Sequence, residues 1–437
     1  MLDRSIVPTP EEAQPTVVEQ RRAGAVLESG AVLESSSAIE TAPPEQDGPN
    51  PKRPGQERHS AAAGSSRAAR FLRATRLDRL TATDRAAIGV VFGSHVALAI
   101  IVYCSAWIQG ANNSHLPLTR GYQQWDANLY VNYAQHGLFS GASAPNNAAF
   151  LPGYPILLAL VHLFVRNWLD SALLLSLIAG CVAAVLLNRL AGSKRAGLFL
   201  FTAPAAAFLS VPYSESLFLA FALGAWYAAQ RADWPVAALL AALAGLTRIN
   251  GLALIPALVV FALLRPGNGR RLTSALIAAA AAIGPFMYLL YLRRATGSWS
   301  AWQQANRKGW NIWMDWPVNA IRNTWRGAYE YGDGSGAYAW SFQLEFFCTI
   351  AAAVLVVVLL VRRAWPEATY CALVLASMLF VNIQQAADRT LLVCFPLYLL
   401  LARAANRRPW IGNAYLWVNA PVAVIAAFLY SSGIWSN

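Results

Sequence analysis

The chain has 437 residues, of which 57% are hydrophobic and only 13% are charged. Soluble globular domains carry about 25% charged residues, so this composition excludes an ordinary soluble protein. The net charge of +12 is compatible with nucleic-acid binding, but the basic residues flank apolar segments, as in the cytoplasmic loops of membrane proteins. The charge therefore indicates contact with lipid headgroups rather than with nucleic acid.

Residues 1–80 differ from the rest of the chain in composition. They are rich in Pro, Glu, Ser, Gly, Ala and Arg and show no hydrophobic periodicity. Such a segment cannot bury enough apolar surface to offset its chain entropy, which predicts a disordered cytoplasmic tail. Five arginines at three-residue spacing end this segment, and they fit either a basic interfacial helix or a solvated run of charge. They are Arg67, Arg70, Arg73, Arg76 and Arg79.

Residues 81–437 contain repeated apolar runs, many of them long enough to cross a hydrocarbon layer of ~30 Å. Continuous runs of Ala, Leu and Val are typical of helices, and only helices or closed barrels satisfy the backbone in lipid. We therefore predict one all-α, polytopic transmembrane domain with about eleven crossings. The predicted spans are residues 86–107, 170–190, 196–213, 215–230, 235–247, 250–264, 272–292, 342–361, 367–383, 390–402 and 411–434.

The positive-inside rule orients these spans with the N-terminus in the cytoplasm. The basic clusters between the runs all become cytoplasmic only if residues 150–165 do not cross the bilayer. This run is short and contains two prolines near its start, so we predict an extracytoplasmic juxtamembrane helix. The polar segments then all emerge on the extracytoplasmic side. They are residues 124–128, 150–155, 212–215, 247–251, 302–316 and 386–389.

The grouping of these polar segments at one face bears on function. Transporters place their polar groups near the bilayer midplane, often in broken helices. Polar segments that gather at one membrane surface instead favour chemistry on a lipid-borne substrate.

Short motifs within these segments follow one another in a specific order from residue 86 onward. They are Trp125–Asp126, FLPGYP at 150–155, YSES at 213–216, TRING at 247–251, the Trp-rich loop at 302–317, and Arg389 with Phe395–Pro396. The ordered set resembles the PIG-V-type family (GPI mannosyltransferase II) of the GT-C superfamily of membrane glycosyltransferases, including its bacterial relatives. Gly153 and Thr390 depart from the family's usual residues, which leaves sugar and acceptor preference open.

This resemblance implies a GT-C-like fold and an inverting glycosyltransferase. The expected reaction moves a sugar, mannose by resemblance, from a polyprenyl-phosphate donor to an extracytoplasmic lipid or glycan acceptor. The Arg-, Ala- and Gly-rich usage adds the expectation of a bacterial plasma membrane. A lipid-linked sugar transporter or flippase is the alternative from another class, and a non-catalytic subunit of a cell-wall assembly complex is a second.

Asp126 is the expected catalytic residue. Displacement at an anomeric carbon needs a base for the acceptor hydroxyl, and a lone carboxylate beside aromatic residues at the membrane boundary suits that task. Asp is also a favoured helix N-cap, and a helix that begins at Ala127 would give Asp126 that role instead. With the family resemblance, the base is the favoured role.

The leaving phosphate needs cations, and four extracytoplasmic residues are expected to supply them: Arg248, Arg389, Arg307 and Lys308. Arg248 separates two short apolar stretches, where an unpaired charge is costly, so we expect it to contact phosphate or Glu215. For Arg389 the alternative is a snorkelling or salt-bridged arginine at the membrane boundary.

The expected sugar- and acceptor-binding residues come from the same motifs. Glu215 fits three roles: it can orient the sugar, pair with an arginine, or act as a first-turn acid of the following helix. The tryptophans of the 302–317 loop also fit an ordinary interfacial aromatic belt. The expected residues are Trp125, Asn128, Tyr154, Tyr213, Glu215, Asn250, Gln303 and Gln304.

The sequence indicates no metal site and no cofactor. Its five cysteines (Cys104, Cys181, Cys348, Cys371 and Cys394) stand singly in apolar runs, without Cys or His neighbours at ligand spacing. A polyprenyl-phosphate sugar carries a single phosphate, which arginines can neutralise without a cation. The alternative is a divalent ion held by Asp126 or Glu215.

Overall fold

The computed structural model describes residues 80–110, 118–141, 144–266, 269–330 and 336–434. All of these residues belong to one compact unit, Ser66–Asn437. The predicted tail, apart from its last residue, and its five arginines lie outside the described residues. Across the described ranges the regular structure is helical throughout, as predicted.

In the part of the chain that the structure describes, five helical segments are long and apolar enough to cross a membrane. They are α2 (Ala82–Gly110), α6 (Trp168–Ala191), the continuous run Arg271–Thr296 formed by α11, η5 and α12, most of α15 (Gly336–Val361), and α19 (Pro409–Ser431). Each coincides with a predicted span. The chain is therefore an all-α polytopic membrane protein.

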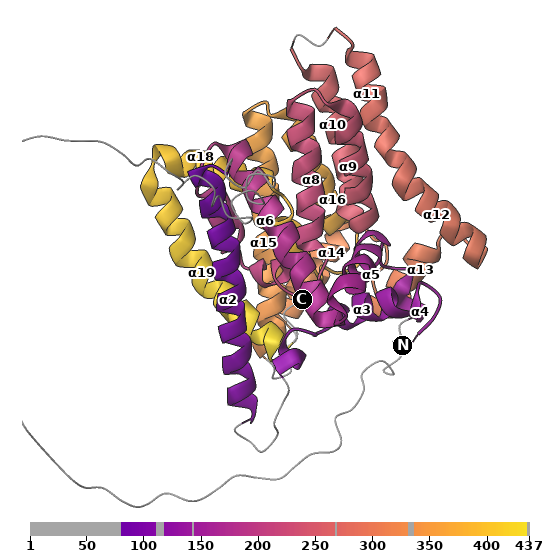
Figure 1. Cartoon of the computed structure of the whole chain (residues 1–437), viewed down its shortest axis with the longest axis vertical. Helices are drawn as coiled ribbons and strands as arrows, with labels where there is room; N and C mark the ends of the chain where they lie inside the picture. Colours follow the sequence, from indigo (N-terminus) through magenta and orange to yellow (C-terminus); the bar gives the residue numbers. More distant parts are fainter. Residues whose placement is uncertain (1–79, 111–117, 142–143, 267–268, 331–335, 435–437) are drawn as a thin grey trace, which may run out of the picture. The chain divides into compact units, whose positions relative to one another are not determined.

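Shorter helices fill most of the remaining predicted spans. Helix α8 packs against α9, and α10 packs against α16 (Figure 1). The bounds of these helices are Glu215–Gln230 for α8, Trp234–Thr247 for α9, Leu254–Leu264 for α10, Trp365–Leu379 for α16 and Pro396–Arg407 for α18. The 3-10 helix η4 (Ile249–Ala253) precedes α10.

The predicted span 196–213 differs from the structure, where it is not one helix. It consists of α7 (Ala196–Leu200), turns, and the 3-10 helix η3 (Ala206–Leu209). Pro204 lies between the two pieces, and a proline removes a backbone donor and disfavours helical backbone in the residue before it. The bent segment packs against α6 and α18.

One end of the bundle, here called the basic end, is defined by contacts between helix termini. Asp84 near the start of α2 pairs with Arg189 near the end of α6. Arg265, just after α10, donates to the carbonyls of Ala229 and Gln230 at the end of α8. Arginines that the positive-inside rule assigns to the cytoplasm thus meet at this end.

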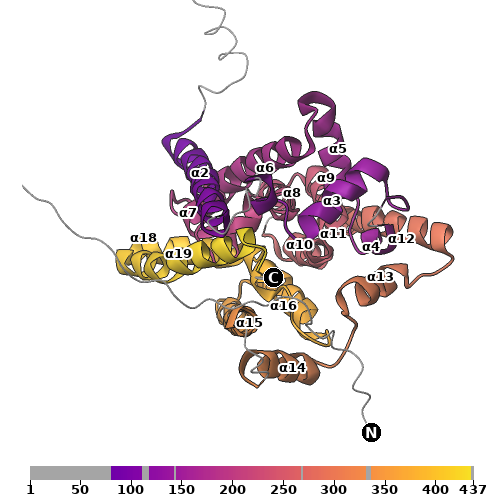
Figure 2. The same ribbon diagram turned by 90° about the horizontal axis from the view of Figure 1, so that it is seen from below.

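The opposite end, here called the motif end, carries the polar motifs. The short helices α3, α4, α5 and α13 gather there (Figures 1 and 2). They span Asp126–His136, Ala144–Asn147, Gly153–Val165 and Ala301–Trp310. Trp302 of α13 donates its indole N–H to the carbonyl of Ala149, which ties the 302–317 loop to the 150–155 motif.

Gly153 explains how α5 approaches α9 so closely. A Cβ atom at this position would lie 2.8 Å from both the carbonyl oxygen of Leu246 and the hydroxyl of Thr247. A larger residue would therefore push α5 away from the end of α9. The close packing of α5 on the end of α9 therefore requires glycine at position 153.

Candidate active site

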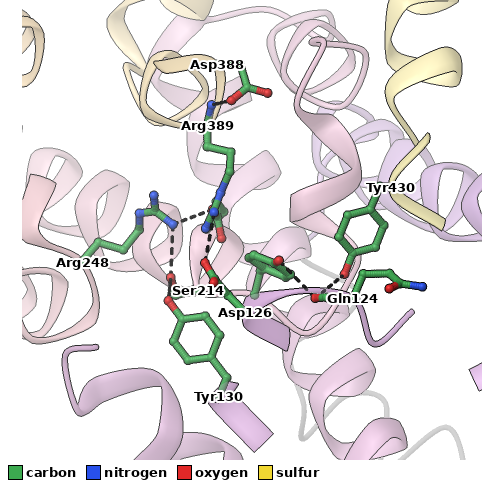
Figure 3. Close-up of polar contacts among 10 residues, drawn as sticks. Gln124, Asp126, Tyr130, Ser214, Arg248, Asp388, Arg389 and Tyr430 are labelled. Atoms are coloured by element: carbon green, nitrogen blue, oxygen red, sulfur yellow. Dashed lines mark hydrogen bonds and ion pairs between the residues drawn. The ribbon is translucent and has the colours of Figure 1, made fainter. Parts of the chain in front are cut away.

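Four charged side chains from distant parts of the chain form one network at the motif end (Figure 3). Arg389 Nε lies 2.7 Å from Glu215 Oε1, and Arg389 Nη1 lies 3.3 Å from Asp126 Oδ2. Arg248 Nη1 lies 2.5 Å from the same Glu215 oxygen. Arg389 therefore joins the two carboxylates, and Glu215 joins the two arginines.

Helix packing explains how these residues meet. Helices α8 and α9 follow each other and pack side by side, so Glu215 at the start of α8 lies beside Arg248 just after α9. Asp126 is the first residue of α3, and Arg389 is the third residue of the short helix α17 (Ala387–Leu392). Three helix N-termini and one helix C-terminus thus place the four charges.

The four side chains differ in exposure. Glu215 is completely buried, Arg389 and Arg248 are 9% and 11% exposed, and Asp126 is 17% exposed. Asp126 is therefore the member of the network that a molecule outside the protein reaches most easily. Asp126 is not the N-cap of α3, because it is already helical and its carboxylate contacts Arg389 rather than the backbone of α3.

Aromatic rings hold the guanidinium of Arg389. Its Cζ lies 4.7 Å from the ring centres of both Phe208 and Tyr213. Burial alone would lower the pKa of Arg389, but Glu215 and Asp126 raise the pKa well above its usual value. Arg389 therefore remains a cation at every physiological pH.

A second layer of hydroxyl groups supports Arg248. Its Nη1 donates to Ser214 Oγ at 3.2 Å, and Ser214 Oγ also contacts the hydroxyl of Tyr130 at 3.0 Å. Burial raises the pKa of Tyr130 to about 12, so this hydroxyl stays protonated. Tyr130 was not expected from the motifs. It lies four residues after Asp126, a spacing that places both on one face of α3.

The loop before Asp126 has a strained backbone, and hydrogen bonds from distant parts of the chain hold it in place. Trp125 has φ 51° and ψ −123°, a region that costs about 1–3 kcal/mol for a residue other than glycine. The hydroxyl groups of Tyr213 and Tyr430 donate to the carbonyl of Gln124, at 3.2 and 3.5 Å. These bonds keep the chain in the conformation that points Asp126 at Arg389 (Figure 3). No sequence signal links Tyr430 to this loop.

The other predicted sugar- and acceptor-binding residues near the network fall into two groups. Trp125 is 41% exposed, and Asn128 is also exposed and donates its side-chain amide to the carbonyl of Gln123. Tyr154, Tyr213 and Asn250 are buried. The structure thus places two of these five where a ligand reaches them directly.

The residues predicted on α13 lie apart from the charged network. Gln303 and Lys308 are exposed, and Gln304 bonds to Ser300 at the start of its own helix. Arg307 lies over the ring of Trp313, with its Cζ 5.7 Å from the ring centre. Among the described residues, no hydrogen bond or ion pair connects these side chains to the four charges.

The described residues contain no group of three or more His, Cys, Asp or Glu side chains that could hold a metal ion. A hollow at the basic end is lined in part by Arg265 and Arg363 and by none of the four charged residues of the network. Another hollow is lined in part by Gln124. The site assignment therefore rests on the charged network and not on cavity size.

Comparison with known proteins agrees with the motifs. The model of the family described as Mannosyltransferase (PIG-V) matches residues 89–265, a range that includes Asp126, Glu215 and Arg248. No curated protein and no solved structure matches the chain. Over residues 89–265 the chain is therefore similar to the PIG-V-type mannosyltransferases, and this similarity supports a membrane glycosyltransferase.

Proposed function

We propose that the protein transfers a mannosyl residue from a polyprenyl-phosphate carrier to an extracytoplasmic lipid or glycan acceptor, with inversion at the anomeric carbon. The observation that carries this proposal is the network in which Arg389 joins Asp126 to Glu215. An accessible acid beside two guanidinium groups provides what displacement on a phosphate-linked sugar requires, namely a base and cations for the leaving group.

Asp126 is the proposed base. Its Oδ2 faces Arg389, while Oδ1 has no hydrogen-bond partner among the described residues. Oδ1 would accept the proton of the acceptor hydroxyl as the hydroxyl oxygen bonds to C1 of the sugar. The bond between C1 and the phosphate oxygen breaks in the same step, and its electron pair leaves with the polyprenyl phosphate. One displacement of this kind converts a β-linked donor into an α-linked product.

Arg389 and Arg248 are the proposed partners of the phosphate. The Arg389–Asp126 pair is the longest of the three ion pairs in the network, at 3.3 Å. An arriving phosphate would therefore weaken this pair before the shorter contacts to Glu215. The same shift would release Asp126 to act on the acceptor, so donor binding would prepare the base. Arg307 and Lys308 on the exposed face of α13 would assist binding.

We propose transfer without a metal cofactor, because two guanidinium groups can balance the charge of one phosphate monoester. A divalent ion at Asp126 or Glu215 is the competing arrangement. Addition of EDTA to the purified enzyme should leave the transfer rate unchanged. A loss of rate that Mg²⁺ or Mn²⁺ restores would establish the competing arrangement.

The direct test uses the purified chain in detergent with polyprenyl-phosphate mannose and an extract of membrane acceptors. A new glycosidic product separates an enzyme from a flippase, because transport leaves no new bond. Asp126→Asn should lower the transfer rate about 10²–10⁴-fold, the usual contribution of general base catalysis. Fluorescence-detected gel filtration should show unchanged folding.

Asp170→Asn is the matched control for this substitution. Asp170 is an exposed acid in the first turn of α6, and α6 runs from the motif end to the basic end. This variant should transfer at the normal rate. If Asp126→Asn also transfers at the normal rate, Asp126 is not the base and the proposed mechanism is wrong.

A further inference from the structure

Arg389 depends on a structural element that is weak by itself. Helix α17 has six residues, and isolated helices shorter than about 12 residues are marginal in water even with favourable sequences. Its N-cap residue is Ala386, which makes no side-chain cap hydrogen bond. Something outside α17 must therefore hold its first turn, and with it the starting point of the Arg389 side chain.

Glu345 supplies that support from a neighbouring helix. It is completely buried in α15, which packs against α17, and its Oε2 accepts the backbone N–H of Ala387, the first residue of α17. A carboxylate at a helix N-terminus satisfies an otherwise free donor and stabilises the helix dipole. Glu345 thus takes the place of the cap that Ala386 lacks.

Hydrogen bonds to distant residues also hold the segment that leads into α17. Asn382 exchanges hydrogen bonds with Trp313 through its backbone and side chain, each at 3.0 Å. The backbone N–H of Gln384 donates to Thr324 Oγ1 at 3.1 Å. The bond from Ala387 to Glu345 is the next anchor along the chain after these two, and Ala387 lies two residues before Arg389.

We propose that Glu345 is a positioning residue for glycosyl transfer. By holding the N–H of Ala387, it fixes α17 so that Arg389 reaches both Glu215 and Asp126. This inference rests on the proposed role of Arg389 at the donor phosphate. In this proposal Glu345 acts through the position of its side-chain oxygen, and the charge of the side chain is not required.

Two conservative substitutions separate reach from charge. Glu345→Gln keeps a carbonyl oxygen at the same distance from the backbone but removes the charge, and it should stay within a few-fold of the normal kcat. Glu345→Asp keeps the charge but shortens the side chain by one methylene, and it should lower kcat about 100-fold, the order of loss expected from a misplaced catalytic group. Glu345→Ala should lose at least as much. A Glu345→Asp enzyme that is more active than Glu345→Gln would overturn the inference.

The second test is a double-mutant cycle with Arg389→Gln. If Glu345 acts through Arg389, adding Glu345→Ala to Arg389→Gln should cause little further loss of rate. Losses that multiply independently would contradict the proposal. If Arg389→Gln alone transfers normally, the proposed function of Arg389 fails. If Arg389→Gln is inactive while Glu345→Ala transfers normally, only the role of Glu345 fails.

Thr349→Ala provides the control for damage to α15. Thr349 is buried one turn after Glu345, and its hydroxyl donates to the carbonyl of Glu345 within the same helix. This variant should fold and transfer normally, because no hydrogen bond in the described structure joins Thr349 to α17. Gel filtration and thermal unfolding of all variants, compared with Glu345→Gln, separate misfolding from misplacement of Arg389.

Discussion

The two ends of the bundle each bury an acid against arginine, but the two arrangements differ in how completely they are satisfied. At the basic end, Asp84 accepts the backbone N–H of Thr81 and two hydrogen bonds from Arg189, at 2.9 and 2.8 Å. Thr81 Oγ1 in turn accepts the N–H of Asp84. This pairing caps α2, ties it to α6, and uses both carboxylate oxygens.

At the motif end the network leaves hydrogen-bonding groups unused. Among the described residues, Glu215 Oε2 and Arg248 Nε are buried without a partner. The backbone at Trp125 is held in a strained conformation one residue before Asp126. Unsatisfied buried groups and backbone strain both cost stability, and they persist where binding or catalysis requires them. The comparison separates a fully satisfied ion pair at the basic end from an incompletely satisfied network at the motif end, where we propose the active site.

Arg389→Gln should produce the largest effect that distinguishes the two ends. It removes the cation that joins Asp126 to Glu215 and should lower the transfer rate about 10²–10³-fold, as loss of one donor to a developing negative charge typically does. Steady-state kinetics with varied donor should also show weaker donor binding. Arg189→Gln is the control at the basic end and should leave turnover per folded molecule unchanged. Equal losses in both variants would erase the functional distinction between the ends.

Much of the fold follows from local properties of the sequence. Apolar runs predict the long helices because the membrane leaves few other ways to satisfy the backbone. The meeting of Glu215 with Arg248 was among the expectations, since two short apolar stretches around Arg248 make an unpaired charge costly. The break at Pro204 carried a sequence signal, but the apolar composition of residues 196–213 outweighed it in the prediction.

The rest of the network depends on long-range packing. Arg389 and Asp126 are 263 residues apart, and nothing in either motif indicates that one contacts the other. The same holds for Tyr430, whose hydroxyl supports the loop before Asp126 from the far end of the chain. Glu345 stands alone in an apolar helix, so its sequence context marks it as unusual without naming its partner.

Asp84→Asn should produce the smallest effect of these substitutions, and it tests whether the ion pair at the basic end is only structural. Asn keeps a side-chain oxygen that can accept the N–H of Thr81, so the variant keeps the cap of α2 and loses mainly the ion pair. Because the Arg189 side chain is 39% exposed and can return to water, the cost should be about 1 kcal/mol of stability, the upper range for exposed pairs. Thermal unfolding in detergent should show a small decrease in melting temperature, while turnover of the folded enzyme stays normal. A large loss of turnover without a loss of stability would mean that charges at the basic end also serve the reaction.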